Sequence, residues 1–387
     1  AGPTVQQACA TSVRALQMAA QEVACGTATS ALLVMADRQS NGPVVYYPDS
    51  SGTGGYGITE HWVPDNMGHD PYAKNPMLQT GENVAARYGI STEEQHALKL
   101  HRYHQYQEAL ADDRAFQKRY MADVPVTDSK FRKQTGTLST DEGIFPTTAE
   151  GLAKLKPVKE GGTVTFGGQT HPADGNAGAI VTTRERARAV ATDPGMEVEI
   201  LGFGMARVEA GYMPMAPSPA AFNALKNAGL SISDVAAIKT HNPFAVNDIA
   251  LARDTGFAWE RMNNYGSSII WGHPQAPTGM RAIIELIEEL VLRGGGVGLF
   301  TGCAAGVKTC AVNAFKGFAA AYLWAGDHAA RPIQRGVCLN RTGQQRVFAR
   351  ARCANHHKQP PGHAAAFGVK PRTSTKRSQT RARAASS

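Results

Sequence analysis

The sequence predicts an α/β fold, because short apolar runs typical of strands alternate with amphipathic helical patterns along much of the chain. Directly after Cys9, apolar residues recur at three- and four-residue steps from Val13 to Ala24, which predicts a helix. The apolar run 30–36 follows and predicts a buried strand that ends in turn-forming residues. A second strand and helix series begins at Glu197.

The elements of the fold can be located from these patterns. Strands are predicted at residues 177–182, 198–203, 235–239 and 297–301. Helices are predicted at residues 80–88, 91–120, 218–229, 245–255 and 278–293, with a further short helical piece at 318–324. Ser91 begins the long polar helix with a capping box, and Gly229 closes its own helix. The segment 43–160 is expected to carry substrate contacts as an excursion from the core.

Composition points to a soluble cytoplasmic enzyme. The 387 residues are 42% hydrophobic and 19% charged, which is ordinary for such a chain. No apolar run reaches the length of a membrane span, and no signal peptide heads the sequence. The six cysteines form no CxxC pair, so the sequence predicts neither a zinc knuckle nor a disulfide framework.

The net charge of +8 is distributed unevenly. From Val307 to the end there are fifteen Lys or Arg residues and one acid, Asp327, which gives a net charge of +14. The remainder has 25 basic and 31 acidic residues, for a net charge of −6. The body is therefore mildly acidic and gives no reason to expect a nucleic-acid partner. The tail is interpreted either as a basic arm or, preferably, as the product of a shifted reading frame.

Four residues have the chemistry of a candidate active site. Cys9 stands at the head of a predicted helix, where the helix dipole favours the nucleophilic thiolate, although most free cysteines are simply small buried hydrophobes. His241, His273 and Cys303 lie where predicted strands end or helices begin, the usual place for α/β active sites. His101 and His104 share one helix face, for which packing or solvation is favoured over metal binding. No metal site is predicted.

Three motifs in order resemble those of the thiolase family. Gln7-Ala8-Cys9-Ala10-Thr11-Ser12 resembles the family's nucleophile motif, Gly272-His273-Pro274 with Thr278-Gly279 its histidine loop, and Gly302-Cys303-Ala304-Ala305-Gly306 its C-terminal cysteine loop. Further stretches resemble the family at residues 80–91, 151–157, 162–165 and 174–177, so the resemblance extends from Pro3 to Gly306.

The resemblance implies a duplicated fold in which two βαβαβαββ halves pack in five layers. The implied organisation is a remnant of the N-terminal half with the nucleophile helix (1–42), a loop domain over the coenzyme A site (43–160), a return to the N-terminal half (161–195), the C-terminal half (196–306) and a basic low-order tail (307–387). Thiolases carry strands and helices before the nucleophile that are absent here, so the N-terminal half is expected to be incomplete and the nucleophile helix to lack strands to pack on.

The resemblance also implies an acyltransferase that works without a cofactor on acyl-CoA and CoA, as in fatty acid metabolism. Cys9 would be acylated, His273 would be its general base, and Cys303 would move the proton at the α-carbon. One oxyanion hole would use His273 and a water held by residue 241, where many thiolases have Asn. The other would use backbone N–H groups of Cys9 and of the Cys303 loop. Met77, Thr170 and Phe244 would line the acyl and pantetheine channel.

The family resemblance further implies a homodimer or homotetramer. Two other functions stay open at the level of sequence. One is a truncated, non-catalytic thiolase-like fragment, because both ends depart from the family pattern. The other is a decarboxylating ketoacyl synthase, because Cys9, His241 and His273 also form the Cys-His-His set of those enzymes, although Cys303 favours a thiolase.

Overall fold

The computed structural model describes residues 2–70, 73–191 and 196–304, together with the backbone of three later strands. The predictions for the rest of the tail lie outside the described residues. All described residues belong to the unit Ala1–Arg352. The α-helices are α1 (Thr11–Cys25), α2 (Trp62–Gly68), α3 (Met77–Tyr88), α4 (Thr92–Lys118), α5 (Ala149–Ala153), α6 (Arg184–Ala189), α7 (Pro217–Ala228), α8 (Ala245–Thr255), α9 (Ser268–Trp271) and α10 (Ala276–Leu292).

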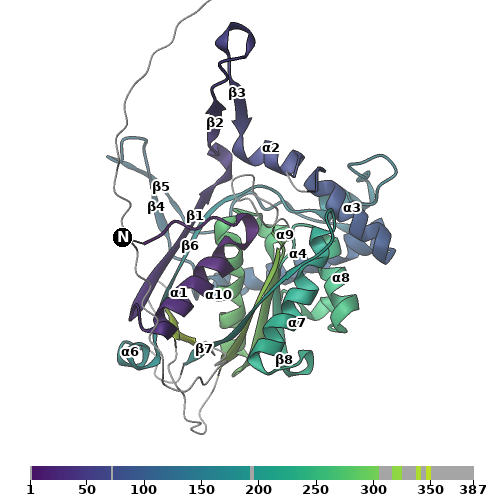
Figure 1. The fold of residues 1–387 in the computed structure, drawn as a ribbon. Coiled ribbons are helices and arrows are strands. Elements are labelled where there is room, and N and C mark those ends of the chain that lie inside the picture. The colour runs from purple at the N-terminus through teal and green to yellow at the C-terminus, as the bar shows by residue number, and fades with distance from the viewer. Residues whose placement is uncertain are drawn as a thin grey trace, which may run out of the picture. The chain divides into compact units, whose positions relative to one another are not determined.

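The strands form two larger sheets and two hairpins. The strands are β1 (Ser30–Arg38), β2 (Val44–Tyr47), β3 (Ile58–His61), β4 (Val124–Thr127), β5 (Gln134–Leu138), β6 (Asp174–Thr183), β7 (Val198–Arg207), β8 (Val235–His241), β9 (Gly296–Gly302), β10 (Lys316–Trp324), β11 (Val337–Asn340) and β12 (Arg346–Ala349). The sheet orders are β1-β6-β11-β12 and β7-β10-β9-β8, and only β8 and β9 are parallel neighbours. The hairpins β2–β3 and β4–β5 lie within the excursion 43–160 (Figure 1).

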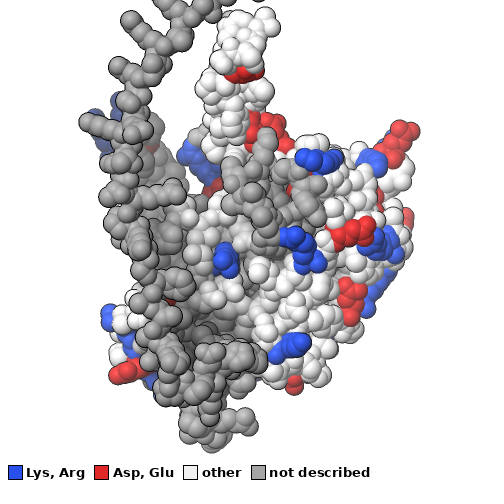
Figure 2. Space-filling view, in the orientation of Figure 1, with Lys and Arg blue, Asp and Glu red and all other residues white. Residues whose placement is uncertain are grey.

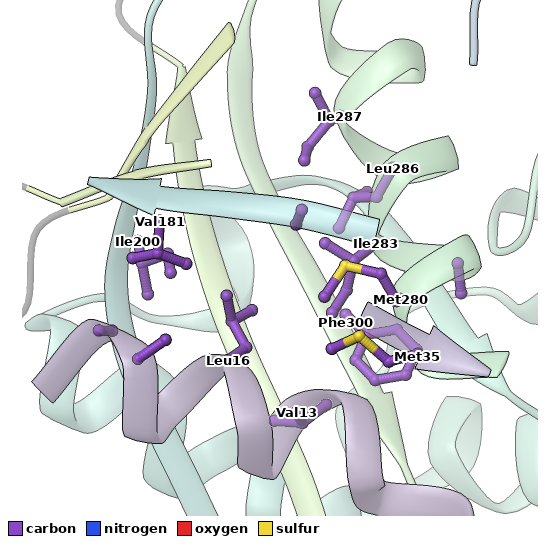
Figure 3. Close-up of a cluster of buried hydrophobic side chains, with 14 of the residues drawn as sticks. Val13, Leu16, Met35, Val181, Ile200, Met280, Ile283, Leu286, Ile287 and Phe300 are labelled. Carbon is purple, nitrogen blue, oxygen red and sulfur yellow. The ribbon is translucent and has the colours of Figure 1, made fainter. Parts of the chain in front are cut away.

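Helices α1 and α10 pack together between the two sheets. α1 contacts β1 and β6, and α10 contacts β1, β6, β8 and β9 (Figure 1). In Figure 3, Val13 and Leu16 of α1 point toward the same buried cluster as Met280 and Ile283 of α10. Fully burying one such side chain contributes roughly 1.5–3 kcal/mol, so this apolar layer holds the two halves together.

In the sheet β7-β10-β9-β8, alternate residues of β8 and β9 face two different helical layers. Ala237 and Phe300 belong to the core cluster with α1 and α10, whereas their neighbours Ile238 and Leu299 belong to a cluster with α7. Successive side chains of a strand point to opposite faces, so β8 and β9 are covered on both sides. Burial on both faces explains the apolar runs of β8 and β9 in the sequence.

The excursion docks onto the second half through α3 and α4. Both helices contact α8, and a fully buried ion pair joins Arg102 of α4 to Asp248 of α8 at 3.0 Å. Ser91 caps α4 by accepting a hydrogen bond from the Glu94 amide, as its capping pattern predicts. The helical pattern is interrupted at residues 111–114, which have non-helical dihedral angles.

The helix face with His101 and His104 is used for packing and solvation. His101 Nε2 lies 2.8 Å from the carbonyl oxygen of Glu260, and its ring meets Trp259 edge-on. His104 is exposed. These contacts agree with the interpretation favoured from the sequence for this pair.

Three sequence predictions about local structure were wrong. The strand at 30–36 forms, but it is not buried, because Leu32 and Val34 point away from α1 and are 67% and 73% exposed. Residues 318–324 lie in strand β10 rather than a helix, because their backbone pairs with β7 and β9. The nucleophile helix does not lack strands, since α1 packs on β1 and β6.

Charged side chains of both signs are interspersed on the described surface. Figure 2 shows scattered Lys and Arg residues as well as Asp and Glu residues among mostly uncharged described residues. No helix among the described residues has both the length and the apolar character needed to cross a membrane.

Candidate active site

Cys9 and His273 meet between the two halves of the molecule. Cys9 lies in the 3-10 turn Ala8–Ala10 that leads into α1, and His273 lies in the loop between α9 and α10. The Cys9 Sγ and His273 Nε2 atoms are 3.0 Å apart, and both residues are buried. Ser12 in the first turn of α1 donates a hydrogen bond to the carbonyl of Ala276 at the start of α10, which ties the two loops together.

His241 joins this pair from the carboxyl end of β8. Its ring stacks on that of His273, with centroids 4.1 Å apart. His241 is paired in register with Gly302 of the parallel strand β9. A Cβ atom at position 302 would lie 3.0 Å from the Cβ atom of His241, so a side chain there would crowd the histidine.

The hydrogen bonds around Ser268 favour one tautomer of His241. The Ser268 hydroxyl donates to Asn242 Oδ1 at 3.0 Å, so its oxygen accepts from His241 Nδ1, also at 3.0 Å. The Asn242 amide is itself oriented, because the Ile269 N–H donates to the same Oδ1 atom. His241 therefore carries its proton on Nδ1 and presents the lone pair of Nε2 to the site. This Nε2 atom is buried and has no hydrogen-bond partner among the described residues.

Cys303 directly follows β9 and is fully buried. The Asn247 side chain donates a hydrogen bond to its sulfur at 3.4 Å. Burial, together with the nearby Cys9 sulfur, raises the pKa of the Cys303 thiol well above its ordinary value, although the bond from Asn247 acts in the opposite direction. Cys303 therefore rests as a protonated thiol that can give a proton.

Burial keeps both histidines neutral. It lowers the pKa of His273 to about 3, and burial with the adjacent His273 lowers the pKa of His241 well below 6.5. A neutral His273 beside Cys9 can accept the thiol proton at physiological pH. Its other nitrogen, Nδ1, lies 2.7 Å from the Thr278 hydroxyl, which orients the ring.

These neutral histidines predict that acid destabilises the fold. Below pH 6.5 the unfolded chain binds protons at positions 241 and 273, whereas the native chain does not. The free energy of unfolding therefore decreases as the pH is lowered. We expect a loss of about 2 kcal/mol per histidine between pH 7.5 and 5. Urea unfolding at the two pH values measures this loss in the free energy of unfolding.

The matched variants for this measurement are His273→Asn and His104→Asn. The first removes a buried histidine and should lose about 2 kcal/mol less than the wild type over the same pH interval. The second changes an exposed histidine and should keep the full wild-type loss. An equal loss in all three proteins would contradict the prediction.

Two of the three predicted channel residues share a cluster with Cys303, and the third is bonded to the loops beside His241. Met77 and Phe244 belong to the same buried apolar cluster as Cys303. Thr170 donates through Oγ1 to the Ser268 carbonyl at 2.5 Å and through its amide to the Pro243 carbonyl at 2.8 Å. Gly81 lets α3 approach closely, since a Cβ atom there would be 3.2 Å from the Phe244 ring. The structure thus brings all seven predicted site residues into one region.

Sequence reasoning missed the residues that support this site. Asn247, Ser268 and Thr278 each hold a reactive side chain, but isolated polar residues carry no signal of such a partner. The backbone beside the two reactive loops is strained, with φ of 44° at Ala8 and 50° at Gln275. Strain of this kind depends on tertiary contacts, so no local pattern indicates it.

A buried polar network supports the turn after β8. Asp248 accepts hydrogen bonds from Arg102, Asn242, Thr240 and Asn263. Because Asn242 also accepts the Ser268 hydroxyl, the network fixes the loop that orients His241. One member comes from α4, so the excursion helps to shape the site.

Comparisons with known proteins agree with this architecture. Residues 1–185 match the model of the thiolase N-terminal domain, and residues 195–315 match that of the thiolase C-terminal domain. The chain is 30% identical to an acetyl-CoA acetyltransferase of Escherichia coli over 313 residues, which cover 79% of this chain and 77% of that protein. It is 35% identical to the peroxisomal 3-ketoacyl-CoA thiolase A of Mus musculus over 227 residues, 57% of this chain and 52% of that protein.

Solved structures give the same result. The crystal structure of human mitochondrial 3-ketoacyl-CoA thiolase matches with a TM-score of 0.73 at 27% identity, covering 83% of this chain and 78% of that one. The acetyl-CoA acetyltransferase of Bacillus anthracis matches with a TM-score of 0.74 at 25% identity, covering 84% and 79%. The α/β fold is that of these proteins, and the chain belongs to the thiolase family.

Proposed function

We propose that this chain is a thiolase-type acyl-CoA C-acyltransferase, which joins or cleaves 3-ketoacyl-CoA through an acyl-cysteine. The observation that carries the proposal is the 3.0 Å contact between Cys9 Sγ and His273 Nε2. It supplies a nucleophile with an adjacent neutral base. Family membership and the names of the relatives, acetyl-CoA acetyltransferase and 3-ketoacyl-CoA thiolase, support the same reaction.

In the first step, His273 Nε2 takes the thiol proton as Cys9 Sγ attacks the thioester carbonyl carbon. The bond from that carbon to the CoA sulfur breaks, and the departing CoA thiolate recovers the proton from His273. The Cys9 sulfur then carries the acyl group. This two-step transfer predicts ping-pong kinetics.

In the second step, Cys303 exchanges a proton with the α-carbon of the other acyl-CoA. In the cleavage direction, Cys9 Sγ bonds to the 3-keto carbon, and the bond from that carbon to the α-carbon breaks. The Cys303 thiol protonates the α-carbon of the departing enolate, which leaves as the shorter acyl-CoA, and CoA then removes the acyl group from Cys9. Condensation runs the same steps in reverse. A water that donates one hydrogen to His241 Nε2 would donate its other hydrogen to the enolate oxygen, since this nitrogen presents a lone pair.

The substrate channel is proposed to pass between the excursion and the second half. Met77, Thr170 and Phe244 would contact the acyl and pantetheine portions. Met77 and Phe244 share a buried apolar cluster with Cys303, and Thr170 is hydrogen-bonded to Ser268 beside His241. We propose no cofactor beyond the coenzyme A thioesters. A structure of human mitochondrial 3-ketoacyl-CoA thiolase with CoA is among the similar proteins.

The compartment and the assembly are separate proposals. Among the described residues, Cys25 and Cys303 are free thiols, which suits a reducing cytoplasm. The exposed Leu32 and Val34 lie on β1, the edge strand of its sheet, and such a surface favours pairing with a second copy in a homodimer or homotetramer. Light scattering on the purified chain measures the assembly.

Thiolysis tests the proposed reaction. We expect the purified chain to convert acetoacetyl-CoA and CoA into two acetyl-CoA, with initial rates that give parallel ping-pong lines. A decarboxylating ketoacyl synthase would instead condense only when a malonyl thioester is supplied. A folded chain that melts cooperatively yet neither cleaves acetoacetyl-CoA nor becomes acylated would be the non-catalytic alternative.

A further inference from the structure

We propose that Cys9, His241 and His273 form a binding site for a thiophilic divalent cation, Zn²⁺, which competes with acylation of Cys9. One ligand atom from each residue lies within 4.8 Å of the others, and all three residues are buried. Among the described residues, these three side chains form the group of histidine, cysteine or carboxylate ligands whose ligand atoms lie close enough together to share one ion. One sulfur and two imidazole nitrogens form a donor set that suits zinc.

Both imidazoles have the outer hydrogen bond that metal-binding histidines use. His241 Nδ1 lies 3.0 Å from the Ser268 hydroxyl, and His273 Nδ1 lies 2.7 Å from the Thr278 hydroxyl. Such partners fix the ring and leave the opposite nitrogen, Nε2, to face the ion. His273 Nε2 lies 3.0 Å from the Cys9 sulfur, and His241 offers a ring nitrogen within 4.8 Å of the other two ligand atoms.

The lone pair of His241 Nε2, which the proposed mechanism gives to a water, is also open to a cation. His241 is 1% exposed, and its Nε2 atom has no hydrogen-bond partner among the described residues. A buried acceptor without a partner costs free energy, and a bound cation removes that cost. The tautomer already presents the lone pair, so zinc binding at His241 requires no proton to be lost there.

Zinc fits this site better than the hard cations. Mg²⁺ and Ca²⁺ prefer oxygen ligands, of which none belongs to the group. Zinc binds sulfur at about 2.3 Å and imidazole nitrogen at about 2.0–2.1 Å, so the three side chains would close in by small rotations. Three protein ligands leave the fourth tetrahedral position to water.

The consequence for catalysis rests on the proposed function. Zinc would bind the Cys9 thiolate, release the thiol proton to solvent and occupy the electron pair that attacks the thioester. An acylated Cys9 has no thiolate, so acylation and zinc would exclude each other. Zinc would therefore act as a reversible inhibitor that acetyl-CoA displaces.

Binding is measured on the full chain after chelator treatment, by titration with Zn²⁺ against a chromophoric chelator. We expect one equivalent in the wild type and binding weakened at least about 100-fold in His241→Asn. Asparagine is the residue that many thiolases carry here, so this variant should fold, which thermal melting checks.

Co²⁺ should give a thiolate charge-transfer absorption that Cys9→Ser abolishes. Cys25→Ser, which changes an exposed thiol, should bind zinc as the wild type does.

Ser268→Ala gives a second test with all three ligands intact. Loss of its hydroxyl should weaken zinc binding about 10- to 100-fold. Unchanged affinity in His241→Asn, or no stoichiometric zinc in the wild type, would overturn the inference. Acylation of Cys9 by acetyl-CoA, followed by mass spectrometry, keeps the proposed function separate: acylation without zinc binding refutes only the metal site.

Discussion

Replacing Cys9 by alanine is expected to abolish acyl transfer. The variant loses the only sulfur that contacts His273 in the described part of the chain, so no acyl-enzyme forms. Loss of a nucleophile that acts as a unit with its base costs on the order of 10⁴- to 10⁶-fold in kcat. Stopped assays of acetoacetyl-CoA thiolysis measure the rate, and mass spectrometry after incubation with acetyl-CoA measures the acyl-enzyme.

The matched control is Cys25→Ala. Cys25 is exposed at the other end of the same helix, so this variant should keep wild-type rates and the acyl adduct. Cys9 packs in the core beside α1, and removing its sulfur should leave a cooperative melt. If Cys9→Ala folds and still transfers acyl groups at an undiminished rate, the assignment of the nucleophile is wrong.

The sequence predicted most elements of the second half because each carries a strong local signal. Helix α8 forms at Ala245–Thr255, the predicted range, and Gly229 closes α7 in the left-handed conformation. β8 and β9 are covered on both faces, so their apolar runs are unambiguous. β1 is equally apolar but covered on one face, and apolar content alone does not reveal that difference.

The site residues were predictable by resemblance, whereas their electrostatics were not. Cys9, His273 and Cys303 lie in three motifs whose order resembles that of the thiolase family, and His241 stands where a predicted strand ends. The tautomer of His241 depends on Ser268, which lies 27 residues further along the chain, and only the folded contacts reveal it. The hydrogen bond from Asn247 to the Cys303 sulfur, and the burial that keeps both histidines neutral, likewise depend on contacts that only the folded chain makes.

Replacing Cys303 by alanine is expected to separate the two halves of the reaction. Cys303 does not contact the thioester that acylates Cys9 in the proposed mechanism, so acylation by acetyl-CoA should proceed within about twofold of the wild-type rate. Thiolysis and condensation both need a proton moved at the α-carbon, and loss of a positioned acid–base group costs about 10²- to 10⁴-fold. Single-turnover acylation and steady-state thiolysis, measured side by side, give the two rates.

The resting protonation of Cys303 makes this experiment decisive. Burial raises the pKa of its thiol, so the group is a proton donor at neutral pH, which is the form that cleavage requires. Cys303→Ser keeps a hydroxyl donor of similar size and should recover part of the thiolysis rate over alanine. An equal fall in acylation and thiolysis would instead mean that Cys303 supports Cys9, because the cysteine loop follows β9 directly beside His241.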